Sequence, residues 1–513
     1  AARVWALGAK IEAETSFIRS EALALPEGTL EGYLGSEPGL APFRPTVQRM
    51  IEEKPHVLSP ETEVALASLG EVLAAPAMIY GRGKSSDMTF EPVADRDGNR
   101  LPVSFAVYEG RYEKSADTVL RRGAYTSFTR GLEAYKNTFA ATWATEVKRN
   151  VVTARLRGYE SAIDMILAGQ GVSRGVYANL HDIILAELAP HMRRYVELRK
   201  RVLGLDKILY CDIEAPLDPE YSPETTYEAA SRIIREGLSV LGEEYTAIIA
   251  EGLRSRWIDL ADNVGKSTGA FCNPVYGVHP YILITWTGSM RDALVLAHEL
   301  GHAGHGVMSQ RYQPLANSLD ASKPLDPVVA FVEAPSTINE LLVGQHILDR
   351  GTDKRMRRWV IMQLLATYHH NFVRHLIEGE LQRRTYALSE QGRPLTEAVL
   401  SKVQGDILEE FWGGVVKIDD GARLTWMRQP HYYMGLYPYT YSAGLTVGTA
   451  LAQAIREQGA PVVDRWLSVL KAGVSKKPLE LALMAGVDMT RPEPIRRAVG
   501  FVGRLVDEVV ESF

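Results

Sequence analysis

The sequence is poor in the features that mark several classes of protein. Among 513 residues it has only two cysteines, Cys211 and Cys272, and no C-x-x-C pair, which argues against a disulfide framework and a thiolate zinc site. Its net charge of −6 is not gathered into long runs of one sign, so neither nucleic acid nor an anionic membrane is an expected partner. No apolar run approaches the ~20 residues that span a bilayer, and the N-terminal residues lack the order of a signal peptide. We therefore expect a cytoplasmic protein.

Linkers, repeats and low-complexity tracts are also absent, although the chain is longer than one typical domain. With 46% hydrophobic and 23% charged residues it can bury a large core. Helical periodicity dominates, so we expect one large, mainly α-helical unit with several lobes. Residues 1–110 are predicted to form an N-terminal helical lobe with a small β-hairpin at Asp97-Gly98, and residues 111–513 the main domain.

The stretch that opens at Ser289 carries the strongest chemical signal. Ser289 and Asp292 form a capping-box pattern, and no proline follows for eighteen positions, so a helix is predicted. On this helix His298 and His302 are one turn apart on one face, where both imidazoles can reach one ion. Glu299 is the predicted general base for a metal-bound water. The H-E-x-x-H pattern favours a zinc hydrolase over a chance match.

A second helical pattern, residues 331–348, supplies carboxylates for the same site. Glu333 and Glu340 are two turns apart on one face, among apolar neighbours that argue against solvated surface acids. Glu333 is the predicted third metal ligand, and Glu340 the carboxylate that holds a ligand imidazole in the right tautomer. The pattern H-E-x-x-H-x-x-G-x-x-H is excluded, because this chain has His305 and Met308 at its last two fixed positions.

Five blocks of the sequence, read in order, carry a family resemblance: GKSTGAFCNP, GVHPYILITW, DALVLAHELGHAGH, FVEAPSTINE and PHYYMGLYPYTYSAG. They resemble the oligoendopeptidase F and thimet oligopeptidase family of zinc peptidases, and a weaker likeness runs from about residue 59 to 487. The resemblance implies a helical zinc-peptidase fold with a small β-sheet beside the H-E-x-x-H helix and a deep substrate channel. It also implies one Zn²⁺ per chain, short peptide substrates and a catalytic domain over residues 111–513. Compared with the thimet branch, a longer path from His302 to Glu333 predicts an inserted loop over about residues 315–327.

The run YILITW, residues 281–286, is typical of a strand directly before the metal helix. The resemblance suggests that this strand borders the cleft, where an extended peptide adds to its edge, and an ordinary buried strand is the alternative. His279, just ahead of the strand, and Tyr437 are predicted substrate contacts.

The segment 430–444 crowds five tyrosines around two glycines and two prolines. In the family, a histidine and a tyrosine from this region donate to the carbonyl oxygen that becomes an anion, and here they correspond to His431 and Tyr439. Tyr437 is the competing choice, and interfacial packing of the tyrosines is the alternative. Three further histidines are predicted to be packing or surface residues: His369, His370 and His375.

These features together predict a zinc-dependent endopeptidase that cuts short unstructured peptides. Two alternatives stay open. A zinc carboxypeptidase of similar helical fold requires a positive group for the free carboxylate of its substrate. A peptide-binding protein that kept the fold and lost catalysis has no need of Glu299. The sequence does not predict an oligomeric state.

Overall fold

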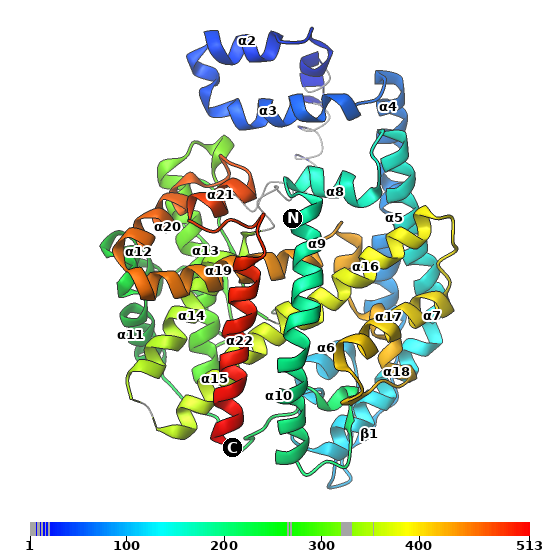
Figure 1. Cartoon of the computed structure of the whole chain (residues 1–513), viewed down its shortest axis with the longest axis vertical. Helices are drawn as coiled ribbons and strands as arrows, with labels where there is room; N and C mark the ends of the chain where they lie inside the picture. The colour runs from blue at the N-terminus through cyan, green and yellow to red at the C-terminus, as the bar shows by residue number, and fades with distance from the viewer. Residues whose placement is uncertain are drawn as a thin grey trace.

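The chain folds into a mainly α-helical molecule, as predicted (Figure 1). The computed structural model describes residues 21–263, 266, 269–319, 331–351 and 353–513, together with residues 7, 11, 14, 15, 17 and 18. Helix α14 (Glu333–Asp349) packs against both α13 (Met290–Tyr312) and α19 (Pro438–Gln458). Around these three helices lie α11 (Tyr227–Gly237), α12 (Glu243–Arg254), α15 (Lys354–Tyr368), α20 (Ala460–Ala472) and α22 (Glu493–Ser512). Helix α16 contacts both α19 and α7, so it joins this group to the helices around α7.

The N-terminal elements are short helices and one hairpin. The Ser59 side chain caps α4 by accepting from the Thr62 N–H, and Leu69 separates α4 from α5. The predicted hairpin is confirmed, with Val93 paired to Leu101. The elements are α2 (Thr29–Ser36), η1 (Pro38–Phe43), α3 (Arg44–Glu53), η2 (Lys54–His56), α4 (Pro60–Ser68), α5 (Gly70–Arg82), η3 (Gly83–Asp87), β1 (Val93–Ala94), β2 (Arg100–Leu101), α6 (Phe105–Val107) and η4 (Tyr108–Tyr112).

Long helices follow, and most begin at a side chain that caps the first free N–H groups. Asp117 caps α7, Ser161 caps α8 and Thr226 caps α11. The elements are α7 (Thr118–Leu156), α8 (Ala162–Gln170), α9 (Arg174–Ile183), η5 (Ile184–Leu188), α10 (Ala189–Val202), β3 (Ile208–Leu209), η6 (Tyr210–Asp212), α11 (Tyr227–Gly237), η7 (Ser239–Leu241) and α12 (Glu243–Arg254).

A three-stranded sheet lies beside helix α13 (Met290–Tyr312). Its strands are β4 (Ile258–Asp259), β5 (Phe271–Asn273) and β6 (Tyr281–Leu283). Strand β6 is central, parallel to β4 and antiparallel to β5, which leaves β5 at an edge of the sheet. The strand predicted at residues 281–286 is present but shorter, and β4 and β5 pair with its two edges, which corrects the expectation that an extended peptide adds to the edge of this strand. Beyond η8 (Leu315–Asn317), the predicted inserted loop runs into residues 320–330, outside the described residues.

The C-terminal half is again helical. Between α15 and α16 the chain forms a π-helical turn, η10. The elements are α14 (Glu333–Asp349), α15 (Lys354–Tyr368), η10 (His369–Arg374), α16 (His375–Glu390), α17 (Glu397–Trp412), β7 (Val416–Lys417), α18 (Asp420–Arg423), η11 (Thr425–Arg428), η12 (Pro430–Tyr433), α19 (Pro438–Gln458), α20 (Ala460–Ala472), α21 (Pro478–Met484) and α22 (Glu493–Ser512). Strand β7 pairs in parallel with β3.

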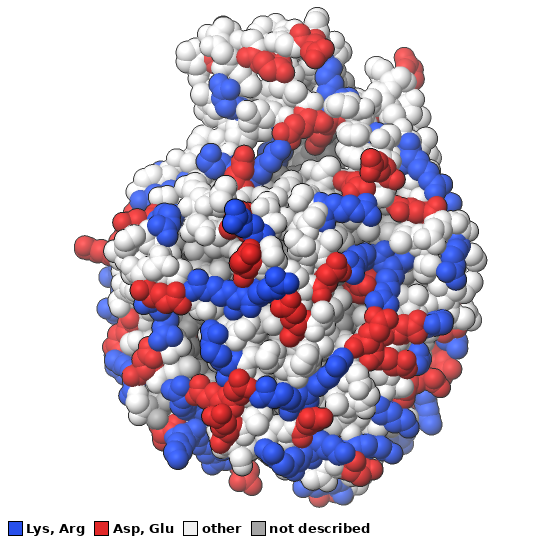
Figure 2. Space-filling view, viewed as in Figure 1, with Lys and Arg blue, Asp and Glu red and all other residues white. Residues whose placement is uncertain are grey.

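The surface shows two features. On the face seen in Figure 2, acidic and basic side chains are interspersed. Within the described residues, one helical stretch, Pro60–Asp87, is long and apolar enough to cross a membrane, with a mean hydropathy of 1.5 and 11% of its apolar window buried. This corrects the expectation that no apolar run approaches such a length, because Glu71 is the one charged residue between Val64 and Gly81. A single helix of this kind is weak evidence of a membrane span.

Candidate active site

Helix α13 begins as the sequence predicts. The Ser289 hydroxyl accepts from the Asp292 N–H at 3.2 Å, and the Asp292 carboxylate accepts from the Ser289 N–H at the same distance. These reciprocal bonds satisfy N–H groups that the first helical turn leaves free. The helix then carries His298 and His302 on one face, with their ring centroids 5.3 Å apart.

Glycines allow α13, α14 and α19 to approach closely. A Cβ on Gly301 would lie 2.5 Å from the Pro335 carbonyl oxygen, so α13 and α14 touch through their backbones here. A Cβ on Gly444 in α19 would lie 2.9 Å from the Glu333 Cβ. Glu333, the first residue of α14, is therefore held between the histidine helix and α19.

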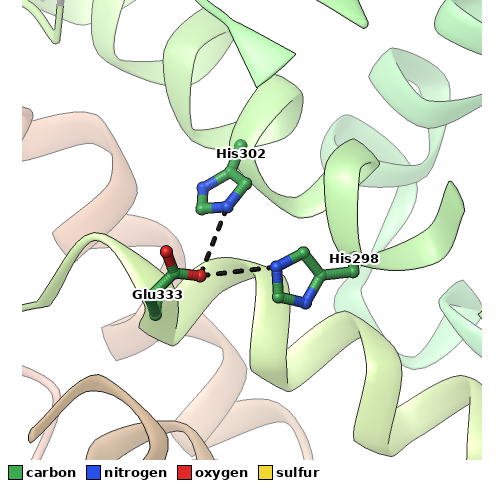
Figure 3. A group of neighbouring side chains, drawn as sticks. All are labelled: His298, His302 and Glu333. Carbon is green, nitrogen blue, oxygen red and sulfur yellow. Dashed lines mark ion pairs between the residues drawn. The ribbon is translucent and has the colours of Figure 1, made fainter. Parts of the chain in front are cut away.

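The structure brings His298, His302 and Glu333 together, and Figure 3 shows both imidazoles turned toward one carboxylate oxygen. The Nε2 atoms of His298 and His302 each lie 3.4 Å from Glu333 Oε2. Ligand bonds of about 2.0–2.2 Å place two donors of a tetrahedral zinc ion about 3.4 Å apart. Each nitrogen therefore lies at a distance from the carboxylate oxygen that fits two donors of one zinc ion.

A carboxylate behind the donor set fixes one imidazole. His298 Nδ1 lies 3.3 Å from Glu340 Oε2, and the other oxygen of Glu340 accepts from the Thr367 hydroxyl at 2.6 Å. Burial alone would lower the pKa of His298, but hydrogen bonds with Glu333 and Glu340 outweigh it and raise that pKa well above its ordinary value. Glu340 thus occupies the position expected of a carboxylate that orients a ligand histidine.

Glu299 lies next to His298 on α13 and has one carboxylate oxygen without a hydrogen-bond partner among the described residues. Its side chain is buried, and the oxygen without a partner is Oε2. Burial raises the pKa of Glu299, against the opposing charges of His302 and His298. A buried carboxylate oxygen without a hydrogen bond costs free energy of folding. This oxygen is therefore suited to accept a hydrogen bond from a water molecule or a substrate.

The tyrosine segment is arranged differently from the expectation. Tyr439 is fully buried, and its hydroxyl donates to Gln170 Oε1 at 2.8 Å while its ring packs against Tyr177. This placement corrects the expectation that Tyr439 faces the scissile carbonyl. The reason is that α19 begins at Pro438, so residues two apart on this helix point to different sides.

Tyr437 and Tyr441, one helical turn apart, lie instead with His431. The Tyr437 ring lies 5.2 Å from the His431 ring and 5.4 Å from the Tyr441 ring, centroid to centroid. Burial, and then the Glu333 carboxylate, raise the pKa of Tyr437, and Glu333 also contributes to the raised pKa of Tyr441. Gly444, which approaches Glu333, follows Tyr441 by three residues and Tyr437 by seven, so both phenols share the Glu333 face of α19.

His279 lies at the start of β6. Its ring stacks on Trp257 with centroids 5.6 Å apart, and its Nδ1 lies 2.8 Å from the Pro280 carbonyl oxygen. None of the contacts among the described residues joins it to His298, His302 or Glu333, so its role as a substrate contact stays a prediction.

Two side chains that the sequence did not assign to the active site lie beside it in the structure. His375 and Glu378, on α16, are buried next to His431. A histidine and a glutamate three residues apart share one face of a helix, so the spacing of His375 and Glu378 was the signal in the sequence for this pair.

Comparison with known proteins decides the family. Residues 111–501 match the family described as "Peptidase family M3", and residues 21–90 match "Oligopeptidase F". The chain belongs to peptidase family M3. It is 33% identical to oligopeptidase PepF of Bacillus subtilis over 97% of this chain and 73% of that protein. It is 28% identical to the group B oligopeptidase PepB of Streptococcus agalactiae over 99% of this chain and 83% of that protein.

Solved structures agree with this assignment. The crystal structure of oligoendopeptidase F from Enterococcus faecium matches with a TM-score of 0.81 and 27% identity, covering 100% of this chain and 85% of that one. The M3 chain is therefore an oligopeptidase with a mainly α peptidase fold, in a family of metallopeptidases. Its candidate metal-binding groups include His298, His302 and Glu333.

Proposed function

We propose that this chain is a zinc-dependent endopeptidase that hydrolyses internal bonds of short, unstructured peptides. The observation that carries the proposal is the convergence of His298, His302 and Glu333 at separations that suit one tetrahedral zinc ion. When bound, zinc supplies Lewis acidity toward a water molecule and the scissile carbonyl. Membership of the M3 family supports peptides as the substrate class.

Glu299 is the proposed general base. Its buried Oε2 has no hydrogen-bond partner in the part of the chain that the structure describes, so it is available to accept a proton from the attacking water and to return that proton to the leaving amine. Burial raises the pKa of Glu299, which brings the carboxylate closer to the range that suits proton transfer near neutral pH.

His431 and Tyr437 are the proposed donors to the carbonyl oxygen that becomes an anion. Burial lowers the pKa of His431 to about 4, so its imidazole is neutral near pH 7 and carries one N–H. Burial and Glu333 raise the pKa of Tyr437, so its phenol keeps its proton. Donors held in place in a partly dry site stabilise developing charge without reorganising. Tyr437 replaces Tyr439 in this role.

Internally quenched peptides with both termini blocked test the proposal directly. The purified chain is expected to cut them at internal bonds, to lose this activity on chelation and to regain it with zinc. A folded protein in the same assay is expected to be spared, as the family resemblance implies. Cleavage of only those peptides that have a free C-terminal carboxylate would instead show a carboxypeptidase, and binding without cleavage by the zinc-loaded chain would show a peptide-binding protein.

A further inference from the structure

A buried cluster of titratable side chains lies next to the proposed active site but outside the zinc donor set. It consists of His375 and Glu378 on α16 and His431 on η12, and one ligand atom from each lies within 4.8 Å of the others. His375 Nδ1 lies 2.8 Å from Glu378 Oε2. Its Nε2 lies 3.0 Å from His370 Nε2. Both ring nitrogens of His375 therefore have partners.

The separations in this cluster are those of hydrogen bonds rather than of ligands around one ion. Donors of a tetrahedral zinc ion lie about 3.4 Å apart, whereas His375 and Glu378 approach to 2.8 Å. The positive charges of Arg374 and Arg428 also act on Glu378, and they oppose a further cation there. The cluster therefore suits shared protons better than a second metal.

Proton counting explains how the cluster holds the His375 ring. Burial lowers the pKa of His375 to about 3, so the ring is neutral near pH 7 and has a single N–H. One of its two bonds must then be donated by His375 and the other accepted. When Glu378 is ionised, His375 donates from Nδ1 and accepts from His370; when Glu378 is protonated, both bonds reverse. The ring stays fixed in either state.

Buried ion pairs anchor the two segments that carry the cluster. The Glu113 carboxylate accepts from Arg374, which precedes His375, with both contacts at 3.0 Å. The same carboxylate accepts from Arg428 at 3.0 and 3.1 Å, only three residues before His431. One buried carboxylate thus ties the start of α16 to the end of η11. A buried pair with several satisfied hydrogen bonds defines geometry well.

The His375 ring contacts His431, one of the two proposed donors, and Tyr441, which packs against the other donor. It stacks on Tyr441 with centroids 4.2 Å apart and an interplanar angle of 14°, and its centroid lies 5.3 Å from that of His431. Tyr441 in turn packs edge-on against Tyr437. The π-helical turn η10 directly before His375 is an irregularity of the kind that often re-aims side chains at functional sites.

We propose that His375, fixed by Glu378 and His370, is a positioning residue that holds His431 directly and Tyr437 through Tyr441 in the orientation in which they donate to the substrate. This proposal rests on the donor roles of His431 and Tyr437 proposed above. It assigns a purpose to a buried histidine and a buried glutamate that hold neither zinc nor the attacking water.

Steady-state kinetics of His375→Ala test the proposal, with zinc content measured in the same samples. The variant is expected to lose about 10- to 100-fold in kcat, the scale for losing a supporting group, at nearly unchanged KM and with one zinc per chain. Glu378→Gln keeps an oxygen that accepts from His375 and is expected to stay close to wild type in kcat, whereas Glu378→Ala is expected to behave like His375→Ala. This pair of variants tests the proposal even if His375→Ala folds poorly.

His369→Ala is the matched control. His369 is the first residue of the π-helical turn that precedes His375, but its ring lies against Trp412 and Glu214. This variant is expected to change stability without lowering kcat. A comparable loss of kcat in His369→Ala would show a general effect of the turn and overturn the positioning role.

A double-mutant cycle separates this proposal from the function on which it rests. If His375 acts through the donors, His375→Ala combined with Tyr437→Phe loses less than the product of the single losses. Two results would overturn the positioning role alone. In one, the losses of kcat in the double variant are fully multiplicative. In the other, His375→Ala keeps a normal kcat while His431→Ala and Tyr437→Phe lose turnover. Silent His431→Ala and Tyr437→Phe variants would overturn the donor roles and this proposal together. A second zinc that disappears in His375→Ala would show a metal site instead.

Discussion

At the scale of single residues, the sequence was most informative where chemistry is local. His298, Glu299 and His302 lie within five positions of one helix, so their common placement follows from helical periodicity alone. Glu333 and Glu340 came from a second helix through their spacing and apolar neighbours. His375 was predicted to be a packing or surface residue, and it is buried. Its proximity to His431 depends on how α16 meets η12, which no local pattern contains.

Glu299→Gln tests the general base. The amide is close in size and cannot accept the proton, so the variant is expected to keep its zinc while kcat falls by about 10²- to 10⁴-fold. Turnover of a quenched peptide and elemental analysis of the same preparation check both parts. Near-normal turnover at normal zinc content would mean that another group takes the proton.

At the scale of elements, the tyrosine segment shows why one assignment was corrected. If the start of the helix is not known, Tyr437, Tyr439 and Tyr441 are equally suitable as the donor to the carbonyl oxygen. Because Pro438 is the first residue of α19, Tyr437 and Tyr441 fall on one face and Tyr439 points elsewhere. A proline at the first helical position was the signal in the sequence that distinguishes them.

Paired substitutions in α19 test this geometry. Tyr437→Phe is expected to lower kcat by about 10²- to 10³-fold with little change in KM, because it removes a donor used in the transition state. Tyr439→Phe removes a hydrogen bond to Gln170 that lies away from the donors, so its kcat is expected to stay near wild type. Loss of turnover in Tyr439→Phe with a silent Tyr437→Phe would reverse the assignment.

Gly301→Ala tests the contact between α13 and α14. The added Cβ would lie 2.5 Å from the Pro335 carbonyl oxygen, so the two helices must separate, and Glu333 moves away from the histidines. Overpacking of this kind costs about 1–3 kcal/mol or more in the free energy of unfolding, and the variant is expected to bind zinc more weakly. Denaturant titration and zinc titration measure the two effects.

Gly32→Ala in α2 is the control for that experiment, because a Cβ there meets nothing within 4 Å. It is expected to leave zinc affinity unchanged and to raise stability by about 0.5–1 kcal/mol, since alanine favours the helix. Equal zinc affinity in Gly301→Ala and wild type would contradict the account of the helix contact.

At the scale of the whole molecule, the fold class followed from composition and periodicity, whereas the packing of segments distant in sequence did not. Glu113, Arg374 and Arg428 come from three separate regions and meet in one buried group. The exposure of the apolar residues in the stretch 60–87 could not be predicted either, because the sequence does not say which face of a helix remains exposed.

A buried histidine predicts how the stability of the molecule depends on pH. Burial lowers the pKa of His181 to about 4, whereas the unfolded chain titrates near the ordinary value of about 6.5. Between these values the unfolded state binds a proton that the folded state does not, so stability falls as pH decreases from about 6.5 to about 4. The full effect is about 3 kcal/mol.

Denaturant unfolding of wild type and His181→Gln across this range measures that contribution. The variant is expected to show a shallower decline than wild type over this pH range. Identical slopes in wild type and His181→Gln would show that His181 does not stay neutral in the folded chain.

The zinc content of the purified, active chain tests the central claim most directly, with Glu333→Ala measured beside it. Three converging donors predict one zinc per chain in the wild type and a strong loss of zinc in Glu333→Ala, because two imidazoles alone hold the ion less tightly. Active wild-type protein without a stoichiometric transition metal would contradict the account.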